Sequence, residues 1–228
     1  MSCAVCTASA VAERAFVLWG SAGHALVLVD LLARLGARVV ASFDNDERAA
    51  PLPGLDLHVG PAGFERWLAT QRDPGSVCGL AAIGGARGRD RLAIQALFAR
   101  HGLELPAVAH PQAALDPGAA LGAGTQVLAQ AVVAAGARLG AACIVNHRAG
   151  VDHECVLGDG VHVGPGATLC GLVRVGDGAF VGAGAVVLPR LAIGADAVVG
   201  AGAVVTRDVP DGAVVAGNPA RPVQRKPS

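Results

Sequence analysis

The sequence of 228 residues has few aromatic side chains and no net charge. It contains no tyrosine, aromatic residues make up 3 % of it, and 18 lysines and arginines balance 18 acidic residues. The chain therefore lacks the positive field that most nucleic-acid-binding proteins use. Although 53 % of the residues are hydrophobic, no run approaches the roughly 20 apolar residues of a membrane-spanning helix. Few rings and abundant alanine, valine and glycine predict a narrow interior filled by small side chains.

The amino-terminal segment shows neither a signal peptide nor a complete zinc motif. Residues 1–14 lack a basic start and a leucine-rich core. Cys3 and Cys6 form a C-x-x-C pair, but no second pair follows at zinc-ribbon spacing, so the other four cysteines are interpreted as small residues of a cytoplasmic protein. We expect residues 1–14 to be a flexible leader, and a redox or metal role of Cys3 and Cys6 stays open.

A six-residue repeat runs through the second half of the chain. An aliphatic anchor occurs at every sixth position, without a break, from Leu115 to Val205. Four residues after the anchor the side chain is usually small, and a glycine, expected to avoid a Cβ clash in the turn, often follows the anchor directly. A period of six fits neither a helix nor a hairpin array. Each hexad thus predicts one short strand and one turn, and three hexads predict one triangular coil of eighteen residues with stacked anchors inside.

The first hundred residues follow another pattern, in which apolar strands alternate with amphipathic helices. We expect strands at 15–19, 38–43 and 77–83 and helices at 24–35, 61–70 and 88–101. This alternation predicts a Rossmann-like α/β fold with a small parallel sheet. Ligands of such sheets bind beyond the carboxyl ends of the strands. There the sequence places the Gly20–His24 turn, the Asp44-Asn45 pair and the Gly84-Gly85 pair.

The Gly20–His24 turn matches no complete nucleotide motif. It lacks the G-x-G-x-x-G spacing of a dinucleotide site and the Gly-Lys-Ser/Thr of a P-loop, and Trp19 stands where a hydrolase elbow has glycine. A glycine-rich turn that opens a helix suits a phosphate, because free N–H groups and the helix dipole point at it. The alternative is a tight turn that requires glycine for its backbone alone.

The succession GSAGHA, FDND, IGG and then hexads such as IGADAVVGAGAVV resembles one family over nearly the whole chain. It is similar to the sialic-acid O-acetyltransferase and nucleotide-sugar N-acetyltransferase group, which includes the UDP-bacillosamine-pathway and GDP-perosamine N-acetyltransferases. The resemblance implies a left-handed parallel β-helix, acetyl-CoA as co-substrate, and a homotrimer with its active site at the subunit interface. It implies that a nucleotide-linked amino sugar contacts Ala22, Gly23, His24, Asp44, Asn45, Gly84 and Gly85. The family usually has glycine or serine at the position of Ala22 and a second acid at that of Asn45, so the nucleotide (UDP, GDP or dTDP) stays open.

Three of the seven histidines, His147, His153 and His162, lie within one stretch of sixteen residues. His153 comes two residues after an anchor, so we expect it on the outside of the stacked triangular coils near a turn, with Glu154 beside it. A histidine with a carboxylate partner can remove a proton near neutral pH. The family motif V-[DE]-H-[DE]-C matches residues 151–155 at every place. By this resemblance His153 is the general base and Glu154 orients it, and any share of Asp152 stays open.

The resemblance also places residues around the co-substrate. It implies that His162, Gly171, Ala183 and Ala201 border the acetyl-CoA channel, the two alanines through backbone groups, and that Asn146 is a polar substrate-binding residue. The alternative for His147 and His162 is that they are surface histidines. Transfer from a thioester to an amine needs a base and a donor to the oxyanion, but no nucleophilic serine or cysteine, so we expect direct transfer without a metal ion.

We expect four segments: the leader 1–14, a nucleotide-sugar-binding α/β domain 15–110, a left-handed β-helix 111–210 and a cap and tail 211–228. Four basic residues cluster around the end of the repeat and either meet the phosphates of CoA or form a solvated cap: Arg207, Arg221, Arg225 and Lys226. The expected function is that of a cytoplasmic acetyl-CoA-dependent N-acetyltransferase of polysaccharide biosynthesis. We expect neither a nucleic-acid partner nor insertion into a membrane.

Three other functions stay open at this point. One is O-acetylation of sialic acid or a related sugar, and an acyl group other than acetyl is also open. Another is a zinc hydratase of the γ-carbonic-anhydrase type, with His147, His153 and His162 as ligands, although their spacing of six and nine differs from that family's and such enzymes lack the first domain. The third is a non-catalytic sugar-nucleotide-binding subunit, which would leave His153 and Glu154 without a role.

Overall fold

The computed structural model describes residues 11–223, and these form two units. An α/β unit comprises residues 11–84 and Asp90–Pro106, and a β-helix unit comprises Gly85–Arg89 and the chain from Ala107 onward. The C-x-x-C pair, Arg225, Lys226 and most of the predicted leader lie outside the described residues. Within the remainder of that leader, Val11 is fully buried.

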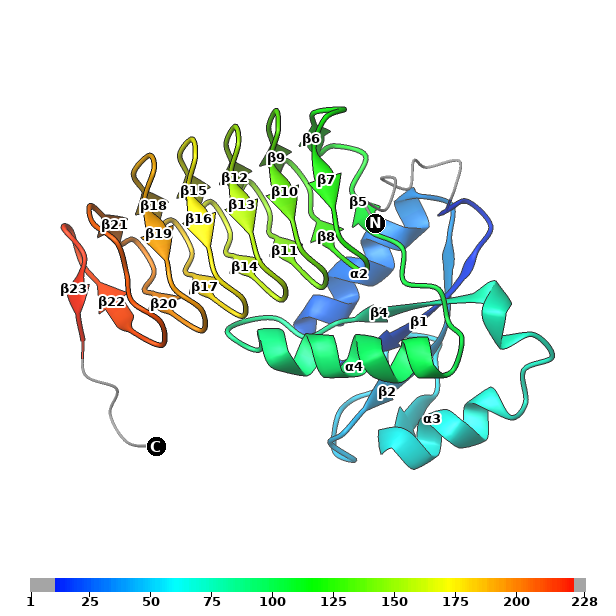
Figure 1. Ribbon diagram of the computed structural model, residues 1–228. Coiled ribbons are helices and arrows are strands. Elements are labelled where there is room, and N and C mark those ends of the chain that lie inside the picture. The colour runs from blue at the N-terminus through cyan, green and yellow to red at the C-terminus, as the bar shows by residue number, and fades with distance from the viewer. Residues whose placement is uncertain (1–10, 224–228) are drawn as a thin grey trace. The chain divides into compact units, whose positions relative to one another are not determined.

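The α/β unit is built on a parallel four-stranded sheet of order β3-β2-β1-β4 (Figure 1). Its elements are β1 (Ala15–Trp19), α2 (Gly23–Arg34), β2 (Arg38–Asp44), β3 (Leu57–Val59), α3 (Gly60–Leu68), the 3-10 helix η1 (Pro74–Ser76), β4 (Val77–Ala81) and α4 (Gly88–Arg100). The first two residues of α4 are assigned to the β-helix unit, and the helix from Asp90 onward belongs to the α/β unit. All six expected elements are confirmed, with ends that agree within two residues. β3 was not expected, because three residues carry no readable periodicity.

Large aromatic side chains fill the interior of the α/β unit. Trp19 packs on Phe43, Phe64 and Phe98 with ring centroids 5.6, 5.9 and 6.0 Å apart. Of the five phenylalanines and two tryptophans of the chain, only Phe180 belongs to the β-helix unit. The expectation of an interior of small side chains is therefore wrong for this unit. A single sheet flanked by helices leaves a wider space to fill than a coil of short strands does.

The β-helix unit consists of short strands on three faces, which pair with an offset of eighteen residues, as Ile144 does with His162. At the carboxyl end the offset falls to sixteen, where Val198 pairs with Val214. The first face contains β5 (Val108–Ala109), β8 (Gln126–Val127), β11 (Ile144–Val145), β14 (His162–Val163), β17 (Phe180–Val181), β20 (Val198–Val199), β22 (Val214–Ala216) and the antiparallel β23 (Arg221–Pro222). The second face contains β6 (Ala114–Leu115), β9 (Val132–Val133), β12 (Gly150–Val151), β15 (Thr168–Leu169), β18 (Val186–Val187) and β21 (Val204–Val205). The third face contains β7 (Ala120–Leu121), β10 (Arg138–Leu139), β13 (Val156–Leu157), β16 (Arg174–Val175) and β19 (Ala192–Ile193).

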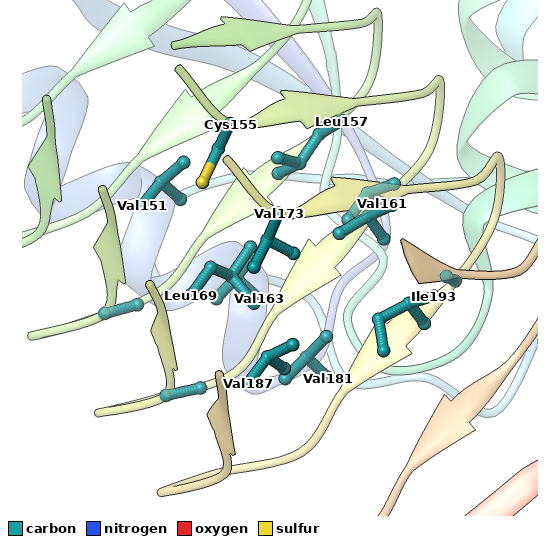
Figure 2. Close-up of a cluster of buried hydrophobic side chains, with 14 of the residues drawn as sticks. Val151, Cys155, Leu157, Val161, Val163, Leu169, Val173, Val181, Val187 and Ile193 are labelled. Atoms are coloured by element: carbon teal, nitrogen blue, oxygen red, sulfur yellow. The ribbon is translucent and has the colours of Figure 1, made fainter. Parts of the chain in front are cut away.

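The aliphatic anchors point into the β-helix, as the period of six predicts. Every anchor from Leu121 to Val205 is at most 5 % exposed, and Figure 2 shows Val151, Leu157 and Val163 among the side chains that meet inside. Leu115 in the first coil is half-buried. The small residues four places after the anchors lie in the same interior. The sequence period thus sets both the register and the core of this unit.

Glycines act at two different places in each turn. The left-handed backbone occurs three residues after the anchor, as at Gly166 (φ +65°) and even at Glu154 (φ +56°). A glycine directly after the anchor instead makes room for the next coil: a Cβ at Gly164 would lie 2.7 Å from the carbonyl oxygen of Val181. The expectation that glycine avoids a Cβ clash here is therefore confirmed, and the clash that it avoids is with the next coil.

Two rows of turns border the second face. The turns between the first and second faces, called here the His147 edge, span residues 110–113, 128–131, 146–149, 164–167, 182–185 and 200–203. The turns between the second and third faces, called the His153 edge, span residues 116–119, 134–137, 152–155, 170–173, 188–191 and 206–208. No helix within residues 11–223 is long and apolar enough to cross a membrane.

Candidate active site

His153 and Glu154 form an exposed pair on the His153 edge. Nδ1 of His153 lies 3.2 Å from Oε2 of Glu154, and the two side chains are 52 % and 63 % exposed. Oδ1 of Asp152 accepts the backbone N–H of His153 at 2.7 Å and so fixes the start of the turn. The Glu154 carboxylate lies on the Nδ1 side of the ring and orients the imidazole, and Nε2 is on the opposite side. The Asp152 carboxylate acts on the backbone of this turn.

Gly171 lies one coil above His153 and provides the space for its ring. The N–H of Leu172 donates to the carbonyl of His153 at 2.9 Å, which stacks the two turns. A Cβ at Gly171 would lie 2.3 Å from Nε2 and 2.5 Å from Cε1 of His153. The imidazole therefore occupies the place of the missing side chain, and its Nε2 faces the Gly171 turn.

Two cysteines, Cys155 and Cys170, belong to turns of the same edge, but neither is an activated nucleophile. Burial raises the pKa of the Cys155 and Cys170 thiols above their ordinary value, and the Asp152 carboxylate raises both further. Sγ of Cys155 also donates to the carbonyl oxygen of Cys170 at 3.2 Å. A thiol with a raised pKa carries little thiolate at neutral pH. The site is therefore better suited to direct transfer than to a cysteine acyl-enzyme.

Asn146 and His162 form a second polar cluster. His162 lies on the first face, and Asn146 begins the turn that follows β11. Oδ1 of Asn146 accepts the N–H of His147 at 2.8 Å, and its Nδ2 lies 3.1 Å from Nε2 of His162. Nδ1 of His162 lies 3.2 Å from the carbonyl oxygen of Gly85, and the ring packs edge-on against Phe180. Since His162 is 5 % exposed, the alternative of a surface histidine is wrong for it.

Of the residues expected around acetyl-CoA, His162 lies on the first face, and the other three are divided between two edges of the chain. Ala183 and Ala201 are exposed on the His147 edge, one coil apart, and the N–H of Gly202 donates to the Ala183 carbonyl at 2.8 Å. Gly171 and His153 are on the His153 edge. The second face lies between these edges, and its outward residues are all uncharged: Ala114, Val132, Gly150, Thr168, Val186 and Val204. A hollow of about 170 Å³ on this face reaches Asp152.

The glycine-rich turn of the α/β unit opens α2 without a side-chain cap. Ala22 is the N-cap residue with extended backbone, and no side chain caps the helix. Gly23 begins the helix, Ala22 and Gly23 are exposed, and His24 is half-buried. The start of α2 thus offers backbone N–H groups and the positive end of the helix dipole to an anion.

Asp44 fastens this turn to the end of β2. Its Oδ2 accepts the N–H of Ser21 at 2.9 Å and its Oδ1 accepts the N–H of Asp46 at 3.0 Å, while Asn45 between them is exposed. The hydroxyl of Ser21 donates to the carbonyl of Ala50. Asp44 therefore shapes the loop, a role that sequence reasoning missed because the Ser21 contact spans 23 residues and follows no motif.

The glycine pair lies at the same end of the sheet, because β1 pairs in parallel with both β2 and β4. A Cβ built on Gly84 would be 4.0 Å from Cβ of His24, and Gly85 has a left-handed backbone (φ +71°). Arg91, a buried residue that sequence reasoning did not single out, donates from its guanidinium to the Ile83 carbonyl at 3.1 Å. In the described part of the chain, no three His, Cys, Asp or Glu side chains are grouped so that they could hold a metal ion.

Comparisons with known proteins agree with this architecture. The family model described as bacterial transferase hexapeptide (six repeats) matches residues 173–207. No curated protein sequence gives a significant match. Among solved structures, the acetyltransferase domain of PglB from Neisseria gonorrhoeae in complex with acetyl coenzyme A is 36 % identical, with a TM-score of 0.82, over 92 % of this chain and 100 % of that one.

Two further structures are similar over almost their whole length. A variant of GDP-perosamine N-acetyltransferase from Caulobacter crescentus, in complex with CoA and GDP-perosamine, is 36 % identical with a TM-score of 0.84, over 94 % of this chain and 99 % of that one. WeeI from Acinetobacter baumannii is 25 % identical with a TM-score of 0.81, over 92 % and 100 %. The likeness covers both the α/β unit and the β-helix unit of this chain.

Proposed function

Because the chain belongs to the hexapeptide-repeat N-acetyltransferases with a left-handed parallel β-helix, we propose that it transfers the acetyl group of acetyl-CoA to the amino group of a nucleotide-linked sugar. The PglB domain was solved with acetyl coenzyme A and the Caulobacter enzyme with CoA and GDP-perosamine. We also infer that the reaction takes place in the cytoplasm, as the sequence predicts.

The observation that carries the proposal is the His153–Glu154 pair below Gly171. In the reaction the amine nitrogen attacks the thioester carbonyl carbon and forms the C–N bond. Nε2 of His153 takes the proton that the amine loses, and the backbone N–H of Gly171 donates to the developing oxyanion. The C–S bond then breaks, and the CoA sulfur leaves and receives the proton. Glu154 stabilises the imidazolium that forms in between.

The nucleotide sugar is assigned to the end of the parallel sheet in the α/β unit. The diphosphate lies at the start of α2, at Ala22, Gly23 and His24, where the helix end is uncapped. Asp44 and Asn45 bind the nucleoside part, and Gly84 and Gly85 admit the sugar because they carry no side chain. Asn146 is the polar residue of the β-helix assigned to the sugar. Asp44 already accepts two N–H groups, so a nucleoside would use its remaining lone pairs.

We assign acetyl-CoA to a cleft between copies of the chain in a homotrimer. The uncharged second face separates the His153 edge from the His147 edge, so a copy packed on this face lies next to both. Such packing places Gly171 on one side of the cleft and Ala183 and Ala201 on another. His162 was expected to border the same channel. As placed, its ring is buried and hydrogen-bonded to Asn146 and Gly85.

The test of this mechanism is His153→Ala, assayed as thiol release from acetyl-CoA with a panel of UDP-, GDP- and dTDP-linked amino sugars and sialic acid. We expect the parent protein to acetylate one nucleotide amino sugar and the variant to lose about a hundredfold or more of the rate, because the amine is left without its base. The size of the assembly should not change.

His147→Ala is the matched control, since His147 holds the corresponding turn position on the other edge, and this variant should remain active. Undiminished turnover by His153→Ala would remove the base mechanism. Preference of the parent protein for sialic acid over every nucleotide amino sugar would replace N-acetylation by O-acetylation. A parent protein that binds the nucleotide sugar without turnover would be a non-catalytic subunit.

A further inference from the structure

A strap of five residues, Gly85–Arg89, follows β4 and packs on the β-helix unit to which it belongs. A Cβ on Gly88 would lie 2.3 Å from the carbonyl oxygen of Gly160 and 2.9 Å from Cα of Gly178, so backbone meets backbone. Nε of Arg89 donates to Oδ1 of Asp196 at 3.1 Å, and the same guanidinium forms an ion pair with this carboxylate. The strap is therefore held at its carboxyl end by close packing and charge.

His162 holds the amino end of the same strap. The Asn146 amide is oriented by the N–H of His147, which donates to its oxygen, so the amide nitrogen faces His162. Nε2 of His162 must then be the acceptor, and Nδ1 carries the proton and donates to the Gly85 carbonyl at 3.2 Å. One neutral tautomer satisfies the whole chain of contacts from His147 to Gly85.

The other side of the glycine pair is also fixed. The buried Arg91 guanidinium donates to the carbonyl of Ile83 at 3.1 Å. The carbonyls on both sides of Gly84, at Ile83 and Gly85, are thus hydrogen bonded to buried side chains. A turn held in this way keeps one conformation, and a preformed binding loop loses less conformational entropy when its ligand binds.

We propose that His162 is a positioning residue for the sugar: through its Nδ1–H bond to Gly85 it holds the Gly84-Gly85 turn in the conformation that binds the nucleotide sugar. This role rests on the proposed function, which assigns that turn to the sugar. It differs from contact with acetyl-CoA, because the ring is buried and both nitrogens are hydrogen bonded within the chain. Loss of the bond should therefore weaken the binding of the nucleotide sugar and leave the binding of acetyl-CoA unchanged.

Two substitutions separate the two ring nitrogens. In His162→Asn the side-chain Nδ2 stands the same number of bonds from the backbone as Nδ1 and can still donate to Gly85. In His162→Gln the amide reaches the place of Nε2 and can still meet Asn146, but the Gly85 bond is lost. We expect His162→Gln to raise the KM for the nucleotide sugar about tenfold and His162→Asn to change it less than about threefold. The KM for acetyl-CoA should stay constant in both variants.

The experiment measures kcat and both KM values of the parent and the two variants, using the sugar from the panel that the parent acetylates. Amide hydrogen exchange over residues 83–89 is followed in parallel, and it should be faster in His162→Gln than in His162→Asn. Arg89→Gln is a third variant that loosens the strap at an exposed side chain and so keeps the fold. It should raise the KM for the sugar about threefold.

Each result has one meaning. A rise of the acetyl-CoA KM in both His162 variants would assign the side chain to the co-substrate channel and overturn the proposal. Equal behaviour of the two His162 variants, or a fall of kcat alone, would also overturn it. No turnover by the parent with any nucleotide sugar would refute the proposed function and this role together, whereas an active parent with unaffected variants refutes only this role.

Discussion

At the scale of the residue, the candidate site depends on a glycine whose missing side chain leaves room for a histidine ring. Gly171 has no Cβ, and the His153 imidazole occupies that place. The local motif was sufficient to predict the His153–Glu154 pair, because both residues belong to one turn. The bond between His162 and Gly85 could not be predicted, since 77 residues separate the two and a backbone carbonyl leaves no trace in the sequence. The same is true of Ser21 and Asp44.

Gly171→Ala should displace the His153 ring and lower kcat about a hundredfold, because the new Cβ would lie 2.3 Å from Nε2. The measurement is kcat in the thiol-release assay, with circular dichroism to show that the fold is kept. Gly118→Ala is the control, since its new Cβ would approach only an oxygen of the Asp116 side chain, at 3.1 Å. If Gly171 acts through His153, adding Gly171→Ala to His153→Ala should cost little more. A fully active Gly171→Ala would contradict the close approach.

Strand register is what the sequence predicts best at the scale of the element. The six-residue anchor period predicts which residues point inward, and the ladder pairs with an offset of eighteen follow from it. The α/β unit is less regular. Its strand β3, which pairs with the carboxyl end of β2, has three residues and no period of its own. The strap likewise follows no pattern, because Gly88 is required by tertiary contact with Gly160 rather than by local backbone preference.

The β-helix offers a matched pair of positions on β13. Leu157 points inward and is 3 % exposed, whereas its neighbour Val156 points outward and is 39 % exposed. Leu157→Ala should lower the free energy of unfolding by about 2–5 kcal/mol, because the stacked anchors cannot close the cavity. Val156→Ala should change it by less than about 0.5 kcal/mol. Urea denaturation followed by circular dichroism measures both, and equal effects would mean that the assigned faces are wrong.

The distribution of charge over the three faces matters at the scale of the whole molecule. The outward residues of the second face are uncharged, while the third face carries Arg138 and Arg174 on either side of Val156. Val132 on the second face is 44 % exposed in one chain. An exposed apolar surface next to the candidate base is typical of an interface. The six-residue repeat does not predict that this face is uncharged. It determines the inward anchor of each strand and places no constraint on the outward residue.

Thr168→Glu should therefore dissociate the proposed homotrimer into folded monomers. Thr168 lines the hollow of the second face, and three copies of the substitution would each bury an unpaired carboxylate, at about 3–5 kcal/mol per interface. Val156→Glu is the control with the same charge, because it lies between Arg138 and Arg174 on the third face and should leave the assembly intact.

Sedimentation velocity gives the mass of each variant, and thiol release gives its activity. Since the His153 and His147 edges of one chain do not meet, the Thr168→Glu monomer should lose acetyl transfer while it still binds the nucleotide sugar. A monomeric parent protein, or a fully active Thr168→Glu monomer, would show that the reaction needs no second copy.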